Sequence, residues 1–225
     1  NLSFEDISLT NTSKNSGNYM GLILESTASI ENVAFRRITI NSGNYSYVGC
    51  IGSSNGPLKD IVAEDLTITA ASGSYIAGVA GDQEQPVENL TVIGNTTTKS
   101  GTKDMTSSYT VTAGTSDRVG GVFGYVATTL KDVDINGIFV TGGTYTGGMS
   151  GMIQWKTNDS KYRTTIKDSK IVSTQNNCGG ISGRENDRSS TPGYFTVEHC
   201  YITARGYAAG ILGHISQAWT RCYMV

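Results

Sequence analysis

The chain has 225 residues, with 17 lysines and arginines against 19 aspartates and glutamates, and its formal net charge is −2. So small an excess of charge gives no reason to expect a nucleic acid or an anionic membrane as a partner. Hydrophobic residues make up 37% of the chain. Because no apolar run approaches the roughly 18 residues that a membrane-spanning helix needs, we expect no membrane insertion.

The first recurring element is a triplet in which apolar, polar and apolar residues alternate. Such alternation indicates a short strand with one buried face. The triplets occupy residues 2–4, 33–35, 61–63, 90–92, 133–135, 164–166 and 195–197. Two mostly polar residues follow each triplet, and a second alternating segment comes after most of these pairs. The second segments occupy residues 7–9, 38–40, 66–68, 138–140 and 200–202.

The polar pair after each triplet predicts a corner, and its charge changes sign over the first three repeats. The three pairs are Glu5 with Asp6, Arg36 with Arg37, and Glu64 with Asp65. Opposite charges would face each other in stacked strands, so we expect a solvated ion-pair ladder. A column of polar residues before the triplets should define a further corner by bonding to the backbone. That column comprises Asn1, Asn32, Asp60, Asn89 and Asp132.

The third recurring element is a glycine step, a short apolar segment that begins with a glycine and in most copies ends with another. The leading glycines are Gly21, Gly49, Gly78, Gly121, Gly148, Gly180 and Gly210. They are 28, 29, 43, 27, 32 and 30 residues apart. Such a period belongs to repeat architectures. No 3.6-residue pattern is sustained, so leucine-rich and ankyrin-like repeats fit badly.

These elements predict an all-β fold, a right-handed parallel β-helix of about seven rungs with three short strands in each rung. The repeat continues along the whole chain, so we expect residues 1–225 to form a single β-solenoid segment. Neither end carries a cap, and an uncapped rung offers unpaired backbone groups. We therefore expect a segment of a longer protein, whose neighbouring repeats or domains are its partners, or a module that associates end to end.

Binding is expected where the repeat is interrupted, because loops carry function more often than walls do. Irregular insertions are expected near residues 94–118, 152–163 and 184–194. The candidate binding residues are Tyr109, Arg118, Trp155, Tyr162 and Arg184. Trp155 with Tyr162 is the best pair for stacking on a sugar or holding a partner protein. The alternative is that these two rings only cover the base of a loop.

Reactive groups are scarce in the sequence. His199 and His214 are the only histidines and lie in different repeats, which does not fit the paired ligands of a zinc peptidase. The alternation places Cys200 inward and His199 at a corner, which disfavours a catalytic pair. The charged corners could form the acidic and basic cluster of a polysaccharide lyase, but their arginines would repel a calcium ion. We expect no catalytic residue, no metal and no cofactor.

Outward threonines raise the alternative of an ice-contacting face. The two aligned pairs are Thr67 with Thr69 and Thr96 with Thr98. Phe139, Lys170 and Tyr201 interrupt these columns, so ordinary β-propensity explains the threonines better.

The four cysteines follow the same alignment. Cys200 and Cys222 share an inward column on neighbouring rungs, within reach of a disulfide. Cys50 and Cys178 lie four rungs apart and cannot pair. Buried thiols that pack as small apolar groups are the favoured state.

The glycine step joined to an apolar strand resembles the GLUG-motif repeats of large secreted and cell-wall-anchored bacterial proteins. The clearest copies are VGGVFG at residues 119–124, CGGISG at 178–183 and AAGILG at 208–213. The resemblance implies a surface-exposed stalk or adhesin-like module, of a kind also found beside immunoglobulin A-cleaving metallopeptidases. We therefore expect a non-enzymatic extracellular module at the cell surface that spaces or displays domains and binds host glycan or protein. A carbohydrate-active β-helix enzyme and a self-assembling or ice-contacting solenoid are the alternatives.

Overall fold

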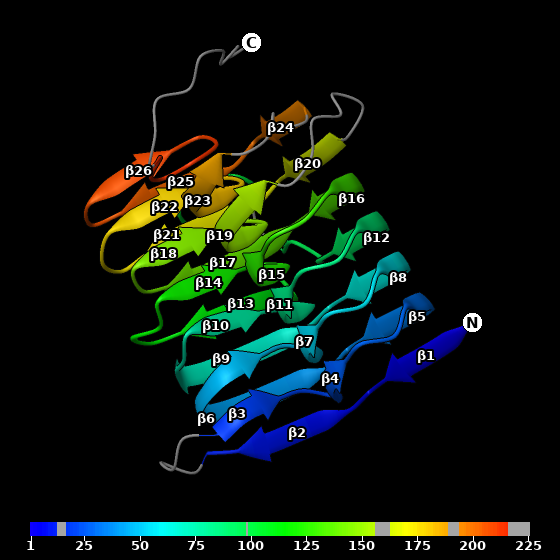
Figure 1. The fold of residues 1–225 in the computed structure, drawn as a ribbon. Helices are drawn as coiled ribbons and strands as arrows, with labels where there is room; N and C mark the ends of the chain where they lie inside the picture. The colour runs from blue at the N-terminus through cyan, green and yellow to red at the C-terminus, as the bar shows by residue number, and fades with distance from the viewer. Residues whose placement is uncertain (13–16, 98, 156–162, 189–193, 216–225) are drawn as a thin grey trace.

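The chain folds as an all-β parallel solenoid, seen here in a computed structural model that describes residues 1–12, 17–97, 99–155, 163–188 and 194–215 (Figure 1). Seven strands stack in one sheet and six in another, so the solenoid has about six turns. The repeats in the sequence predicted about seven rungs. The pairings between these strands are parallel, because each turn lays its strands on those of the turn before. No helix long and apolar enough to cross a membrane occurs in the described part of the chain.

Three sheets form the walls of the solenoid. Sheet 1 holds the predicted triplets and comprises β1 (Leu2–Glu5), β5 (Ile30–Arg36), β8 (Leu58–Glu64), β12 (Val87–Ile93), β16 (Leu130–Asn136), β20 (Arg163–Lys167) and β24 (Tyr194–Glu198). Sheet 3 follows the glycine steps and comprises β4 (Ile23–Ser26), β7 (Ile51–Ser54), β11 (Ala80–Gln83), β15 (Phe123–Val126), β19 (Ser150–Trp155) and β23 (Ser182–Arg188).

Sheet 2 has an outgoing half, which leads away from sheet 1, and a return half, which leads back. The outgoing half comprises β2 (Ser8–Asn11), the first part of β6 (Thr39–Val48), β9 (Thr67–Ser72), β13 (Tyr109–Ala113), β17 (Ile138–Gly142), β21 (Lys170–Ser173) and β25 (Tyr201–Ala204). The return half comprises β3 (Gly17–Met20), the end of β6, β10 (Tyr75–Ala77), β14 (Arg118–Gly120), β18 (Tyr145–Gly147), β22 (Asn177–Gly179) and β26 (Tyr207–Ala209).

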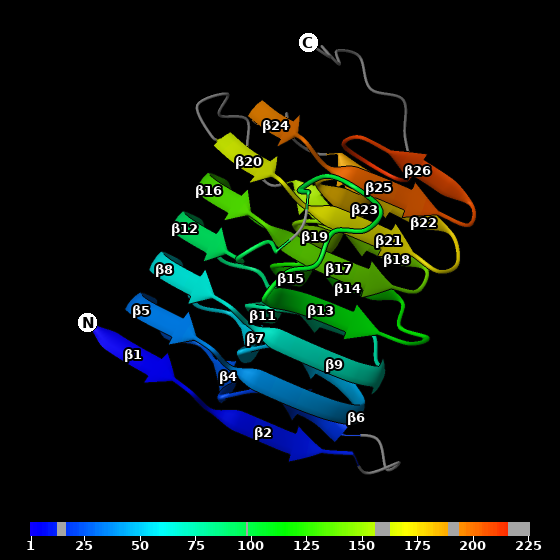
Figure 2. The same ribbon diagram turned by 180° about the vertical axis from the view of Figure 1, so that it is seen from behind.

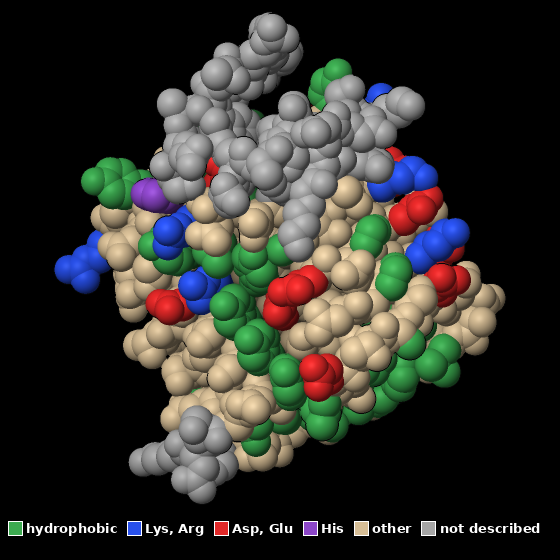
Figure 3. Space-filling model, in the orientation of Figure 1, with side chains coloured by type: hydrophobic (Ala, Val, Ile, Leu, Met, Phe, Trp, Pro, Cys, Tyr) green, Lys and Arg blue, Asp and Glu red, His purple; other side chains and the backbone are tan. Residues whose placement is uncertain are grey.

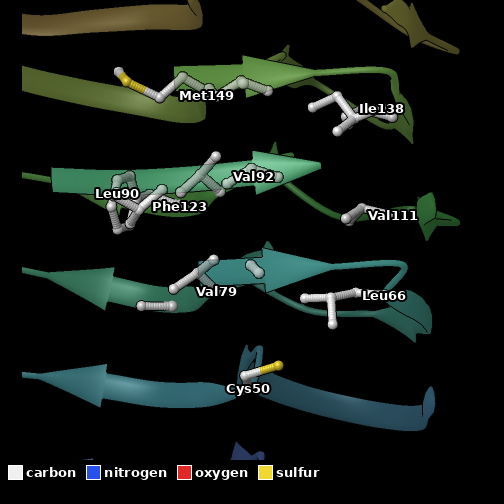
Figure 4. Close-up of a cluster of buried hydrophobic side chains, with 14 of the residues drawn as sticks. Cys50, Leu66, Val79, Leu90, Val92, Val111, Phe123, Ile138 and Met149 are labelled. Atoms are coloured by element: carbon white, nitrogen blue, oxygen red, sulfur yellow. The ribbon is translucent and has the colours of Figure 1, made fainter. Parts of the chain in front are cut away.

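The register confirms that equivalent residues stack in files. Thr39 pairs with Thr67, so the preceding residues Ile38 and Leu66 lie one above the other, and Ile138 follows in the same file. Inward-facing side chains of this kind form one continuous core along the axis. Figure 4 shows part of it, with labelled side chains from successive turns between the walls.

The glycine step is a bend, where the sequence predicted a third strand. Gly78 and Val79 connect β10 to β11, so each predicted third strand divides into a return strand of sheet 2 and a strand of sheet 3. Stacked bends leave no room for a side chain: a Cβ on Gly121 would lie 2.2 Å from the carbonyl oxygen of Gly148, in the next turn. The glycines recur because consecutive bends approach this closely.

Left-handed backbone marks the predicted corners. The residues with positive φ between sheets 1 and 2 are Asp6, Arg37, Asp65, Gly137, Asp168 and His199, at 48–69°. Those at the bend within the sheet 1 strands are Asn32, Asp60, Asn89 and Asp132, at 54–56°. Asn and Asp tolerate this conformation better than other side chains do. This preference explains most of the polar column that precedes the triplets.

The insertion in the fourth turn changes one alignment made from the sequence. Residues 94–108 are inserted at the corner between β12 and β13, so the chain enters the outgoing half of sheet 2 only at Tyr109. Thr110 and Thr112 pair with Thr67 and Thr69, and the alignment of Thr96 and Thr98 with them is wrong. Thr96 instead forms an antiparallel bridge with Ser107 inside the insertion, and residue 98 lies outside the described residues.

Candidate functional site

Sheet 3 packs directly on the return half of sheet 2, and the seam between them runs along one face of the solenoid. A Cβ on Gly124 would lie 2.8 Å from the Cα of Tyr75, and one on Gly151 would lie 2.7 Å from the Cα of Arg118. Each strand of sheet 3 therefore packs against the return strand of the turn below it. As a result, side chains from the two sheets meet at the surface.

We call the side chains along this seam the tyrosine–arginine column. It comprises Tyr19, Tyr47, Tyr75, Arg118 and Tyr145 from the return half of sheet 2, with Tyr125 and Arg184 from sheet 3. All seven side chains are half-buried. Figure 3 shows this face, on which hydrophobic side chains, with tyrosine counted among them, form a band, and lysine or arginine side chains lie beside its upper part.

The tyrosine rings of the column stack on one another. The ring centroids of Tyr19 and Tyr47 are 5.2 Å apart, and those of Tyr47 and Tyr75 are 4.9 Å apart with an angle of 3° between the ring planes. Tyr125 meets Tyr75 at 6.1 Å in a tilted arrangement. Stacking at the rung spacing stabilises the parallel register beyond the area that the rings bury. It also covers ring faces, so the ring edges and hydroxyl groups are left to meet a ligand.

Two arginines continue the stack. The guanidinium of Arg118 lies 4.7 Å from the centre of the Tyr75 ring, on which Tyr47 also stacks. The guanidinium of Arg184 lies 5.1 Å from the centre of the Tyr145 ring, and its Nη1 donates a hydrogen bond of 3.2 Å to the Tyr145 hydroxyl. These contacts hold both cations in fixed positions on the surface.

The phenol groups of Tyr47 and Tyr125 remain protonated at neutral pH. Burial, together with the nearby charges of Asp82 and Glu84, raises the pKa of Tyr125 to about 12. Burial also raises the pKa of Tyr47. The Tyr125 hydroxyl donates a hydrogen bond of 2.7 Å to Oε1 of Gln154. The column can therefore offer neutral hydroxyl donors and acceptors beside its guanidinium groups.

Charge is unevenly distributed along the column. In sheet 3, Glu25 aligns with Ser53, Ser53 with Asp82, and Asp82 with Tyr125, so the two carboxylates belong to the first three turns and Asp82 borders Tyr125 of the fourth. The arginines belong to turns four and six. The half of the column nearer the C-terminus, which we call the basic half, comprises Tyr75, Arg118, Tyr125, Tyr145 and Arg184.

The predicted ion-pair ladder is confirmed at the corner between sheets 1 and 2. Arg36 bonds to Glu5 at 3.1 Å and to Glu64 at 3.2 Å, and Arg37 bonds to Glu5 at 3.2 Å and to Asp6 at 2.7 Å. Hydrogen bonds from Ser3 and Arg36 lower the pKa of Glu5, and a hydrogen bond from Arg37 lowers that of Asp6. Carboxylates held in their ionised form are poorly suited to proton transfer near neutral pH.

The arrangement around Cys200 does not favour nucleophilic chemistry. Burial raises the pKa of its thiol to about 11, and its Sγ lies 3.2 Å from the carbonyl oxygen of Glu198. His199 is an exposed corner residue whose Nδ1 lies 3.7 Å from Oδ1 of Asp168. No cluster of three or more His, Cys, Asp or Glu side chains able to hold a metal ion is found among the described residues.

The other cysteines occupy the core. Cys50 and Cys178 are fully buried free thiols, and burial raises the pKa of Cys178 to about 12. Both pack as small apolar groups. Cys222, the proposed partner of Cys200, lies outside the described residues.

The five candidate binding residues do not form one site in the structure. Tyr109 is fully buried, and its hydroxyl donates a hydrogen bond of 2.8 Å to the carbonyl oxygen of Gly121, so it is a core residue and not a surface contact. Arg118 and Arg184, expected in separate insertions, instead meet the same column of tyrosines. Tyr162 and the side chain of Trp155 lie outside the described residues.

Part of the insertion at residues 94–108 packs against the body of the solenoid. Met105 is 1% exposed, and Nζ of Lys170 donates a hydrogen bond to the carbonyl oxygen of Lys103. Figure 2 shows this green segment extending across the outgoing half of sheet 2. Lys103 and Asp104 are exposed and can still contact a partner.

A second repeat signal in the sequence, separate from the glycine steps, predicts the column. A tyrosine stands two or three residues before the leading glycine in five of the seven steps. These five are Tyr19, Tyr47, Tyr75, Tyr145 and Tyr207. One large aromatic residue at a fixed phase of a repeat predicts a stacked file, whichever face of the wall it occupies.

Comparison with protein-family models, with curated proteins and with solved structures gives no match. The resemblance to GLUG-motif repeats therefore depends on the glycine steps themselves.

Proposed function

We propose that the chain is a non-enzymatic module of an extracellular, cell-surface protein, which spaces or displays neighbouring domains and binds host glycan or protein. The observation that carries this proposal is the uninterrupted stack of about six turns. Its parallel ladders and single core make a stiff body about 30 Å long. A rigid body of this kind suits a stalk, and the resemblance of its bends to GLUG repeats supports the same function.

The surface offers two places for adhesion. One is the tyrosine–arginine column, whose side chains are held by strands. The other is the insertion at residues 94–108, where Lys103 and Asp104 are exposed. The ion-paired corner carboxylates support a structural role for the charged cluster that a lyase would otherwise use.

An array of glycans and extracellular matrix proteins, probed with the whole chain, tests the proposal. We expect binding to at least one class of ligand, and no shortening of any bound polysaccharide during incubation. Replacing residues 99–104 with two glycines removes the exposed tip of the insertion and shows whether that loop takes part.

Depolymerisation of a polysaccharide would overturn the proposal in favour of an enzyme. The decisive form of that result is cleavage by the wild-type chain that disappears in the double variant Glu64→Gln, Asp65→Asn. The absence of binding to every ligand of the array would leave spacing as the function and would overturn adhesion.

A further inference from the structure

We propose that the basic half of the tyrosine–arginine column binds an anionic polysaccharide, one whose sulfate or carboxylate groups meet Arg118 and Arg184. This inference rests on the proposed adhesive function and specifies its ligand and its site. It moves the binding surface from the insertions to a wall of the solenoid.

The two guanidinium groups are available to an anion. Neither Arg118 nor Arg184 forms an ion pair with a carboxylate among the side chains that the structure describes. The Nε of each is buried and has no hydrogen-bond partner, so an anion has to meet the terminal Nη groups. By contrast, Arg36 and Arg37 at the charged corner are fully engaged with carboxylates. A planar guanidinium without a counter-ion matches a sulfate or carboxylate in geometry as well as in charge.

The arginines are positioned in advance for an extended ligand. Arg118 lies in β14 and Arg184 in β23, two turns further along the solenoid. Because β23 packs on β18, the return strand one turn beyond β14, their levels differ by about 5 Å along the axis. Because tyrosine rings fix both cations, little side-chain entropy is lost when a ligand binds. A chain with repeated anionic groups that lies along the axis can contact both arginines at once.

The tyrosines supply the contacts that a sugar chain needs between its anionic groups. The hydroxyls of Tyr125 and Tyr145 belong to the same surface, where the first donates a hydrogen bond to Gln154 and the second accepts one from Arg184. The faces of the Tyr75 ring are covered by Tyr47 and Arg118, so ring stacking on a neutral sugar is not available there. The column should therefore discriminate by charge and hydrogen bonding.

An acidic peptide fits this surface less well than a glycan does. Proteins bind extended peptides mainly by adding a strand at a free sheet edge or by holding a helix in an apolar groove. Here β14, β18 and β22 are consecutive and paired within sheet 2. What the surface presents is a face of hydroxyl and guanidinium groups, which suits a chain rich in hydroxyls.

Equilibrium binding of the whole chain to four soluble probes tests the inference: heparin fragments, hyaluronan, dextran and poly-glutamate. We expect binding to heparin, to hyaluronan or to both, and none to dextran. Affinity should fall steeply between about 0.05 M and about 0.5 M NaCl because the contacts are ionic. Arg118→Gln and Arg184→Gln should each weaken binding roughly tenfold, and the double variant roughly a hundredfold.

Three control variants test whether binding depends on the two arginines of the column. Arg163→Gln removes an exposed arginine from sheet 1, on another wall, and should leave affinity unchanged. Tyr145→Phe keeps the ring beneath Arg184 but removes the hydroxyl that accepts its hydrogen bond, and should weaken binding less than Arg184→Gln does. Arg184→Lys keeps the charge but loses the planar stack, and should fall between the wild type and Arg184→Gln. Circular dichroism and the melting temperature establish that each variant is folded.

The failures of the two proposals are distinguishable. If the wild type binds neutral glycans or proteins but no polyanion, or if the double variant binds polyanions as well as the wild type does, this inference is wrong and adhesion stands. If poly-glutamate binds as tightly as the polysaccharides and is lost in the same variants, the ligand is an acidic peptide and the assignment to a glycan is wrong. If the wild type binds neither these four probes nor any ligand of the array, adhesion is wrong as well.

Discussion

At the scale of single residues, the glycines have the clearest physical reason for recurring. A Cβ on Gly21, Gly121, Gly148 or Gly180 would come within 2.1–2.4 Å of the carbonyl oxygen of the glycine that leads the next step. None of these four has a positive φ. Close approach of stacked bends, not backbone freedom, therefore selects glycine at these positions.

Gly121 and Gly210 allow a matched test of this explanation. A Cβ on Gly121 would meet the Gly148 oxygen at 2.2 Å and Cδ1 of Ile138 at 2.3 Å, whereas one on Gly210 would meet nothing within 4 Å. We expect Gly121→Ala to lower the free energy of unfolding by about 1–3 kcal/mol. Gly210→Ala should change it by less than about 0.5 kcal/mol. Chemical denaturation measures both, and equal effects of the two substitutions would contradict the explanation.

Tyr109 shows where reasoning from single residues fails. A tyrosine inside an insertion is expected at the surface, but the insertion ends at residue 108 and Tyr109 begins a buried strand. The Tyr109 hydroxyl reaches the Gly121 carbonyl across the core because Gly78 has no side chain. A Cβ on Gly78 would lie 1.9 Å from the Tyr109 oxygen and would block this hydrogen bond. Such a pairing between residues of different turns is invisible until the register is known.

At the scale of elements, the corner between sheets 1 and 2 combines left-handed backbone with paired charges. Arg37 has a φ of 51°, which is uncommon for a side chain of its kind. Two ion pairs, to Glu5 and Asp6, anchor its guanidinium. The order of charges read from the sequence was sufficient to predict this ladder. The φ values agree with the two-residue interruption that marked each corner.

The corner should make stability depend on acid pH. The pKa values of Glu5 and Asp6 are lowered in the fold from their ordinary values of 4.5 and 3.8. Their contribution to stability is therefore complete above those values and is lost as the pH falls through the lowered ones. We expect the melting temperature to drop between about pH 5 and about pH 2.

The variant Arg37→Gln isolates the contribution of the corner to this acid dependence. Without the guanidinium, the two carboxylates lose their main partner, so the melting temperature should fall less steeply with pH. Arg205→Gln, at an exposed arginine beyond β25, is the matched control and should leave the slope unchanged. A slope in Arg37→Gln equal to that of the wild type would show that other carboxylates dominate the acid transition.

The sequence predicted the strands of sheets 1 and 2 better than the bends. Alternation of apolar and polar residues has a direct counterpart in a wall with one buried face, so the triplets and second segments were found. The glycine steps were predicted as strands, because a run of small and apolar residues reads the same in a buried strand and in a buried bend. The fourth turn was misaligned because its insertion falls between the two strands that define the corner.

At the scale of the whole molecule, the fold is a stack in which each turn contacts mainly its two neighbours. Sheet 1 runs in the order β1-β5-β8-β12-β16-β20-β24, without a strand out of sequence. In such a quasi-one-dimensional structure, stability is approximately a sum over turns and the interfaces between them. The tyrosine–arginine column follows the same logic, because it exists only when the turns are in register. The repeat predicted this architecture, but which residues share the seam depended on how sheet 3 packs on the return strands.

Hydrogen exchange of backbone amides should follow this stacking. The strand β12 is central in sheet 1, with three strands of the sheet on each side, whereas β1 and β24 are the two edge strands. In the isolated chain we expect the slowest exchange in β12 and the fastest in β1 and β24 among the strands of that sheet, because outer turns open without disturbing inner ones. Uniform protection across the sheet would indicate a single all-or-none unit.

Val92 and Val197 give a matched pair of substitutions for the same question. They occupy one inward file, reached through Ile135 and Ile166, but Val92 lies in the central β12 and Val197 in the outermost β24. Val92→Ala should lower the free energy of global unfolding by about 2 kcal/mol and speed exchange in turns on both sides. Val197→Ala should speed exchange only near β24, because opening of the outer turn already limits protection there. Hydrogen exchange measured strand by strand separates these outcomes. If both substitutions speed exchange over the same range of strands, the turns do not unfold independently.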